Sequence, residues 1–225
     1  MIAISQFDDG GSVMRTDRWP RPVHLGPHED ARYVAVSPDG RRVATGSHAW
    51  DGCKIWDMQS RWDAPSAKFE IKLPIDNSTV GFSPDGRWLA TTGAGLRLWS
   101  VGSWKPGPAI GGFAFAFSPD GGLLAVETNS GVIRLVDPNT GHEYCRLEDP
   151  NQDRARYIDF SPDGTRLIAT NDDSQCVHVW DLRIIREQLT GLHLDWNLPP
   201  YPPRTPEDPT PLEVQVNTLA IRFDG

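Results

Sequence analysis

Residues 34–44 read Val-Ala-Val-Ser-Pro-Asp-Gly-Arg-Arg-Val-Ala, and this stretch decides the fold. Apolar side chains alternate on both sides of a central Ser-Pro-Asp-Gly, which is the pattern of two β-strands joined by a tight turn. Proline presets the φ angle at the second turn position, aspartate tolerates the third, and glycine supplies the positive φ that follows. The stretch therefore predicts a β-hairpin.

The tetrapeptide is repeated along the chain. It begins at Ser37, Ser83, Ser118 and Ser161, and each copy has alternating apolar residues on both sides. We predict positive φ angles at the glycines of all four copies, which are Gly40, Gly86, Gly121 and Gly164. A third alternating segment follows each turn and ends in a matched pair, namely Trp56-Asp57, Trp99-Ser100, Val136-Asp137 and Trp180-Asp181.

Units of about forty residues, with four strands and a Trp-Asp pair ending the third strand, resemble the WD-repeat (Trp-Asp repeat) family over roughly residues 1–181. The resemblance implies an all-β protein, a β-propeller of four-stranded antiparallel blades that pack face to face. We expect four full blades plus a partial one, with a short C-terminal helix and a Pro-rich tail. An antiparallel sandwich with accidental repetition would not keep the turn and the tryptophan in register.

We expect four regions along the chain. These are a partial blade (1–30), four WD-repeat blades (31–181), an amphipathic helix (182–198), and a Pro-rich tail (199–225) with a possible outer strand at 212–216. On the helix, Leu182, Ile185, Leu189 and Leu192 fall on one face.

The partial first blade lacks an innermost strand, so the chain resembles the C-terminal piece of a longer propeller. The segment from Trp180 to Pro202 is similar to the C-termini of large bacterial WD-repeat signalling proteins, in which a kinase domain often precedes the propeller. The chain itself contains no kinase motif.

The resemblance also implies structural roles for residues at particular positions of the repeat. His28 with Asp51 and Trp56 would build part of the family's buried hydrogen-bond network, and Ser47 is a further candidate. Trp99 and Trp180 keep the tryptophan of the signature pair, whereas the other units lack the histidine.

A partner-binding surface is expected on the top face of the propeller. Arg32 and Arg156 stand five residues before the serines of their turns, where the family places the entry of the innermost strand. Their guanidinium groups suit an acidic or phosphorylated peptide, because an arginine can donate two parallel hydrogen bonds to a carboxylate or a phosphate. The alternative is that they are solvated and bridge to loop aspartates such as Asp30 and Asp153. The remaining candidates on the same face are His48, Trp50, Asn129 and Asp172.

Composition excludes several classes of function. A formal charge of −8 and a pI near 5.2 argue against nucleic acid as a partner. No apolar run reaches membrane-spanning length, and the N-terminus is not a signal peptide. The cysteines Cys53, Cys145 and Cys176 show no paired spacing, and the histidines show no metal-ligand spacing. We therefore expect a cytoplasmic protein without a metal or cofactor.

The sequence thus predicts a non-catalytic protein–protein interaction scaffold or sensor module that binds a protein or peptide. Two alternatives remain open: the propeller domain of a hydrolase or Tol-associated periplasmic protein, which shares the Ser-Pro-Asp-Gly repeat, and a nonfunctional gene remnant. A half-propeller exposes the flanks of its terminal blades, so self-association that completes the ring is also expected.

Overall fold

The computed structural model describes residues 1–6, 9–16, 21–48, 51–59, 66–128, 131–149, 151–171 and 175–201. Within them, the strands form five antiparallel sheets, and each strand pairs with the next along the chain. The first sheet contains β1 (Ile2–Gln6), β2 (Gly10–Met14) and β3 (Val23–His24). The second contains β4 (Ala31–Val36), β5 (Arg42–Ser47), β6 (Cys53–Asp57) and β7 (Lys68–Leu73).

The remaining sheets follow the same order. The third contains β8 (Val80–Phe82), β9 (Trp88–Thr91), β10 (Arg97–Ser100) and β11 (Pro106–Ala109). The fourth contains β12 (Phe115–Phe117), β13 (Leu124–Glu127), β14 (Val132–Val136) and β15 (Glu143–Glu148). The fifth contains β16 (Ala155–Phe160), β17 (Arg166–Asn171) and β18 (Val177–Asp181). The predicted all-β architecture of propeller blades is thereby confirmed.

Each Ser-Pro-Asp-Gly turn joins the first two strands of its sheet and satisfies its own polar groups. In the second sheet, the Ser37 hydroxyl donates to Asp39 at 2.6 Å and accepts from the Arg42 backbone N–H at 2.9 Å. Asp39 also accepts from the Arg41 N–H at 3.0 Å, and Gly40 donates to the Ser37 carbonyl at 2.8 Å. The other three turns repeat these contacts within about 0.1 Å.

The four turn glycines have positive φ angles, as predicted: 67° at Gly40, 73° at Gly86, 72° at Gly121 and 70° at Gly164. An L side chain is strained in this region, whereas glycine is not. The repeated tetrapeptide is therefore the device that sets hairpin register in four of the five sheets.

Neighbouring sheets pack face to face through apolar clusters. The second sheet illustrates this, because alternate residues of one strand face opposite neighbours. Val43 packs toward Val13 and Val23 of the first sheet, while Ala44 packs toward Leu89 of the third. Two further clusters join the third sheet to the fourth and the fourth to the fifth. Burial of each large aliphatic side chain in these junctions stabilises the fold by about 1.5–3 kcal/mol.

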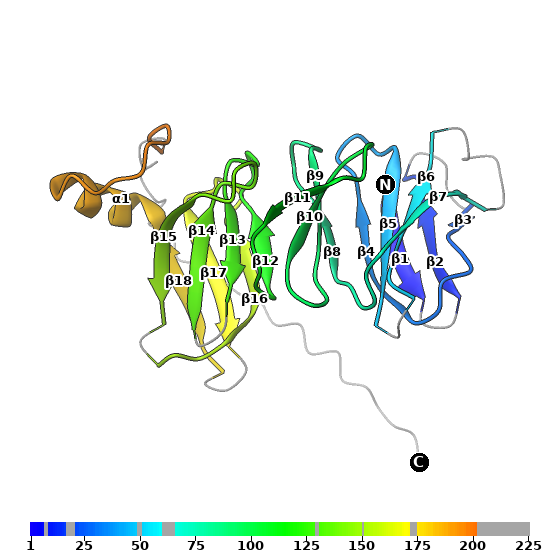
Figure 1. The fold of residues 1–225 in the computed structure, drawn as a ribbon, viewed down its shortest axis with the longest axis horizontal. Coiled ribbons are helices and arrows are strands. Elements are labelled where there is room, and N and C mark those ends of the chain that lie inside the picture. Colours follow the sequence, from blue (N-terminus) through cyan, green and yellow to red (C-terminus); the bar gives the residue numbers. More distant parts are fainter. Residues whose placement is uncertain are drawn as a thin grey trace, which may run out of the picture.

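The sheets follow one another in chain order, with the first sheet at the right of Figure 1 and the fourth and fifth at the left. Among the described residues, no apolar cluster joins the first sheet to the fifth. Their outer faces instead expose Ile2 and Ile4 on β1, and Val177 and Val179 on β18. Self-association through these faces stays a prediction.

Two details differ from the sequence expectation. The fifth sheet has three strands rather than four within the described residues, and the outer strand proposed at 212–216 lies outside them. The helix, α1, spans Leu182–Gly191 and is shorter than the 182–198 region expected. Leu192 ends the helix as its C-cap and is exposed, so it does not extend the apolar face of Leu182, Ile185 and Leu189. α1 is too short to cross a membrane.

Candidate functional site

The buried hydrogen-bond network of the second sheet is centred on Thr45. The Thr45 hydroxyl lies 2.6 Å from Nδ1 of His28 and accepts from Nε1 of Trp56 at 2.9 Å. Val43 pairs with Trp56 and Thr45 with Lys54, so Thr45 and Trp56 are diagonal neighbours on one face of the sheet. The network therefore holds the tryptophan in a fixed position at the end of β6.

Ser47, the further candidate for this network, lies two residues beyond Thr45 on β5. Its hydroxyl donates to the Glu29 carbonyl at 2.8 Å. Asp51 is 4.0 Å from Nε2 of His28, beyond hydrogen-bond distance, and instead accepts from Lys54 at 2.6 Å and Lys72 at 2.8 Å.

The charges of these groups follow from their surroundings. Burial, reinforced by the positive charge of Lys54, lowers the pKa of His28 to about 4, so the imidazole is neutral near pH 7. Burial alone would raise the pKa of Asp51, but hydrogen bonds from Lys54 and Lys72 outweigh it and lower the value to about 2. The network thus combines a neutral ring with an ionised carboxylate at its edge.

The third sheet keeps only part of this arrangement. Trp99 donates to the Thr91 hydroxyl at 2.9 Å, in the same diagonal position, without a histidine. In the fourth sheet the corresponding residues are Val136 and Val126, and in the fifth Ala169 stands where the threonine would be, beside Trp180.

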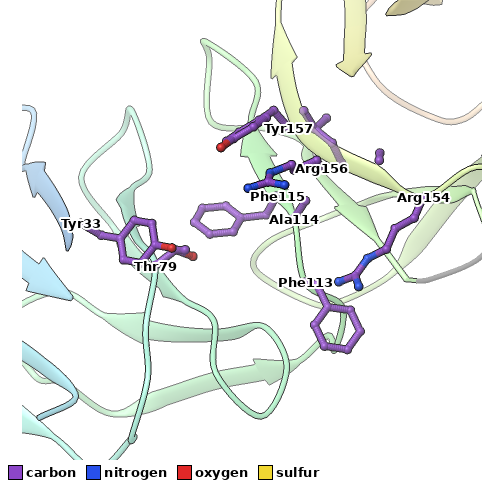
Figure 2. Close-up of a pocket in the computed structure, with 10 residues that line it drawn as sticks. Tyr33, Thr79, Phe113, Ala114, Phe115, Arg154, Arg156 and Tyr157 are labelled. Carbon is purple, nitrogen blue, oxygen red and sulfur yellow. The ribbon is translucent and has the colours of Figure 1, made fainter. Parts of the chain in front are cut away.

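A second group of residues lines a cavity of about 680 Å³, called here the inner-face cavity. Its walls come from or adjoin the first strands of the second to fifth sheets, and Figure 2 shows the side chains converging from these separate strands. Four lining residues occupy one equivalent position, four residues before the serine of each turn: Tyr33, Thr79, Ala114 and Tyr157. Phe113, Phe115, Arg154, Ala155, Arg156 and Ile158 complete the lining.

Arg154 is held in place within this cavity. Its guanidinium lies 4.8 Å from the centre of the Phe113 ring, and its Nε is 3.6 Å from a carboxylate oxygen of the fully buried Glu127. Arg156 lies 5.6 Å from the centre of the Tyr157 ring, which is 66% exposed. A guanidinium that is oriented before binding loses less conformational freedom when it meets an anionic group.

Comparisons with known proteins agree with this architecture. The model of the family described as "WD domain, G-beta repeat" matches residues 21–57 and 146–181, and these segments include both complete Trp-Asp pairs. The chain contains WD repeats in these two segments.

Several curated relatives share the repeat. The WD repeat-containing protein SL1-17 of Schistosoma mansoni is 34% identical over 137 residues, which cover 57% of this chain and 43% of the relative. EARP-interacting protein 1 of Caenorhabditis elegans is 35% identical over 83 residues, or 36% of this chain and 23% of the relative. The target of rapamycin complex subunit LST8 of Mus musculus is 25% identical over 168 residues, or 69% of this chain and 49% of the relative.

The chain spans less than half the length of each of these three relatives. All three come from animals, so the resemblance to large bacterial signalling proteins stays a prediction.

The structure places the two arginines predicted for the partner-binding surface in different surroundings. Arg156 lines the inner-face cavity, whereas Arg32 pairs with Asp30 at 2.7 Å and does not line it. His48 lies 3.9 Å from the same Asp30. Arg32 thus makes the contact with a loop aspartate that the alternative interpretation describes, and its role in partner binding stays a prediction. Trp50, Asn129 and Asp172 lie outside the described residues.

Sequence reasoning missed Arg154 and the aromatic side chains of the inner-face cavity. A usable signal was present, because Tyr33 and Tyr157 directly follow the two arginines that were singled out. Strict strand alternation would send Arg156 and Tyr157 to opposite faces, but the register shift between Ala155 and Tyr157 accompanies their meeting at one cavity. Within the described part of the chain, no three His, Cys, Asp or Glu side chains come together to hold a metal ion.

Proposed function

We propose that this WD-repeat protein is a non-catalytic protein-interaction module whose inner-face cavity binds an extended acidic peptide, including a phosphorylated one. The observation that carries the proposal is the pairing of Arg154 with Glu127 and Phe113 in a cavity that Arg156 also lines. These arginines are the only charged residues that line the cavity within the described part of the chain.

The shape of the cavity favours a peptide over a small molecule. Tyr33, Phe113 and Tyr157 are exposed although they are large and apolar, which is typical of surfaces that bind another protein. They come from separate sheets, so an extended chain can contact them in succession while its carboxylates or phosphates meet the arginines.

The relatives support binding of proteins in general. One is named as a subunit of a complex and another as an interacting protein, and we extend only that broad role to this chain. A place in a longer signalling protein and a cytoplasmic location remain parts of the proposal. No observation on the described residues favours the hydrolase-associated or Tol-associated alternative.

The test is a titration of fluorescent ten-residue peptides into the purified chain, followed by anisotropy. One peptide carries glutamates, one carries a phosphoserine, and a third replaces these residues with glutamine and serine. We expect the charged peptides to bind and the double variant Arg154→Ala/Arg156→Ala to weaken binding by about tenfold or more, since hydrogen bonds to charged groups contribute about 1.5–3 kcal/mol.

Arg146→Ala is the matched control, because Arg146 is an exposed arginine on the outer strand β15 that pairs with Glu143 at 2.6 Å. Thermal unfolding of each variant checks that the fold survives. Equal affinity of the double variant and the wild type for the charged peptides would refute the site, and binding of the neutral peptide alone would refute the charge argument.

A further inference from the structure

A second cavity lies at the other end of the hairpins of the fourth and fifth sheets. It has a volume of about 330 Å³ and is formed between two Ser-Pro-Asp-Gly turns and the segment that follows α1. We call it the C-terminal cavity. Proline and aromatic rings and one leucine side chain make up much of its lining: Pro119, Pro162, Trp196, Leu198, Pro200 and Tyr201.

Arg186 of α1 builds one wall of this cavity. Its side chain is 8% exposed overall and donates to both carboxylate oxygens of Asp195, at 2.9 and 3.0 Å. It also donates to the carbonyls of Leu198 at 2.8 Å and Pro199 at 2.6 Å. The same guanidinium lies 5.4 Å from the ring centre of Trp196 and 5.5 Å from that of Tyr201. The rings are therefore held in place before any ligand arrives.

One buried polar atom of a lining residue has no hydrogen-bond partner among the described residues. Trp196 is 6% exposed, and its indole Nε1 is buried without a hydrogen-bond acceptor among the described residues. Buried donors are almost always paired, because an unpaired one costs about 1–3 kcal/mol. A carbonyl oxygen from a bound chain would satisfy this donor.

Two carboxylates lie beside the rings. Asp120 and Asp163 are the aspartates of the two turns, and both are exposed. The Oδ1 atom of Asp120 accepts from the Ser118 hydroxyl and the Gly122 N–H, at 2.6 and 2.9 Å. Asp163 is shared with Arg183 at 3.0 Å, so Asp120 offers the stronger uncompensated charge to a cation.

We propose that the C-terminal cavity binds an extended proline-containing segment of a partner protein, in which a lysine or arginine stands beside the prolines. A lining of aromatic and proline rings, an indole N–H without an acceptor, and an acidic rim for a cation are complementary to such a peptide. The chain's own residues 202–211 are also proline-rich, but they carry Glu207 and Asp208 with a single arginine, so their net charge opposes the acidic rim.

The experiment follows the indole N–H signal of Trp196 by two-dimensional NMR of the full chain, assigned through Trp196→Phe. The probe is a ten-residue peptide that contains one arginine and has prolines at alternate turns of a polyproline II helix. A second peptide replaces the arginine with glutamate. We expect the arginine peptide to shift the Trp196 signal and the glutamate peptide to leave it in place.

Affinity in the variants separates the contributions. Trp196→Phe keeps a ring against Arg186 but removes the donor, and should weaken binding about three- to tenfold. Asp120→Asn keeps an oxygen for its turn and should weaken binding of the arginine peptide by a similar factor. Asp85→Asn is the matched control, because Asp85 makes the same turn contacts in the third sheet and does not line the cavity. Its affinity should equal that of the wild type.

Two results would overturn the proposal. One is an arginine peptide that leaves the Trp196 signal unmoved at millimolar concentration, or that binds all variants equally. The other is a Trp196 signal that moves without added peptide in Pro203→Ala/Pro206→Ala, together with no binding in trans, which would assign the cavity to the chain's own tail. Neither result bears on the inner-face cavity.

Discussion

Trp56 and Trp180 each begin a Trp-Asp dipeptide at the end of the third strand of their sheets, yet their contacts differ. Trp56 is 2% exposed and donates to Thr45 within a network that includes His28. Trp180 is partly exposed, has Ala169 instead of a threonine as its diagonal neighbour, and stacks on His178 with ring centres 5.7 Å apart.

The aspartates of the two dipeptides differ as well. Among the described residues, Asp57 accepts a local bond from the Gln59 N–H at 2.9 Å, whereas Asp181 caps α1 by accepting from the N–H groups of Arg183 and Ile184. The second sheet packs against neighbours on both faces, and the fifth ends the described row of sheets. The dipeptide therefore marks a position in the repeat, and the neighbouring residues decide what that position does.

The largest expected effect is on the tryptophans. Trp56→Ala removes a fully buried ring and leaves a cavity, and should lower the free energy of unfolding by about 3–5 kcal/mol. Trp180→Ala removes a partly exposed ring and should cost about 2 kcal/mol. Urea unfolding followed by far-ultraviolet circular dichroism measures both, and equal losses would show that the dipeptide itself, rather than its neighbours, sets the contribution.

A second effect concerns pH and the second sheet alone. The unfolded chain protonates His28 near pH 6.5, but the folded chain does so only near its lowered pKa of about 4. Protonation therefore favours the unfolded state, and stability falls as the pH is lowered from about 6.5 to about 4, by on the order of 2 kcal/mol.

Urea midpoints of the wild type and His28→Gln across this pH range measure the effect. The slope should be smaller in the variant, and parallel curves would contradict the prediction. Asp51 acts in a separate window, because its pKa is lowered to about 2 and its contribution is lost only as the pH falls below 3.8.

The smallest effect separates the two aspartates. Asp181→Ala removes the N-cap of α1 and should cost about 1 kcal/mol. Asp57→Ala is the matched change in the second sheet and should stay within about 0.5 kcal/mol. Thermal unfolding of the two variants measures both losses of stability. A larger loss for Asp57→Ala would mean that the role of Asp57 in the sheet exceeds its bond to Gln59.

The sequence was sufficient for features that depend on local chemistry. The four turns, their positive φ glycines, the hairpins and the helix start at Asp181 all follow from residues within a few positions of one another. The place of Thr45 in the network was not predictable without strand register, because Thr45 and Ser47 are both hydroxyl residues on the same face of β5.

The two cavities lay beyond sequence reasoning for a different reason. The inner-face cavity brings Tyr33 and Tyr157 together from the second and fifth sheets, and their approach depends on how the intervening sheets are packed. The sequence indicates only that Arg186 is a charged residue on a helix. Its burial becomes visible through its contacts with Asp195 and the Leu198 carbonyl. Sequence patterns indicate which face a residue takes, and tertiary packing decides what it meets there.

The self-contained Ser-Pro-Asp-Gly turn has a consequence for the speed of folding. Each turn closes a loop of only a few residues, so the entropy lost on closure is small, and hairpins of this kind form in about 1–10 μs. The contacts between successive sheets also connect segments that are near in sequence, which gives a low contact order for an all-β chain. Folding of this chain can therefore begin at any of the four turns and spread to the adjacent sheets, as in other repeat proteins.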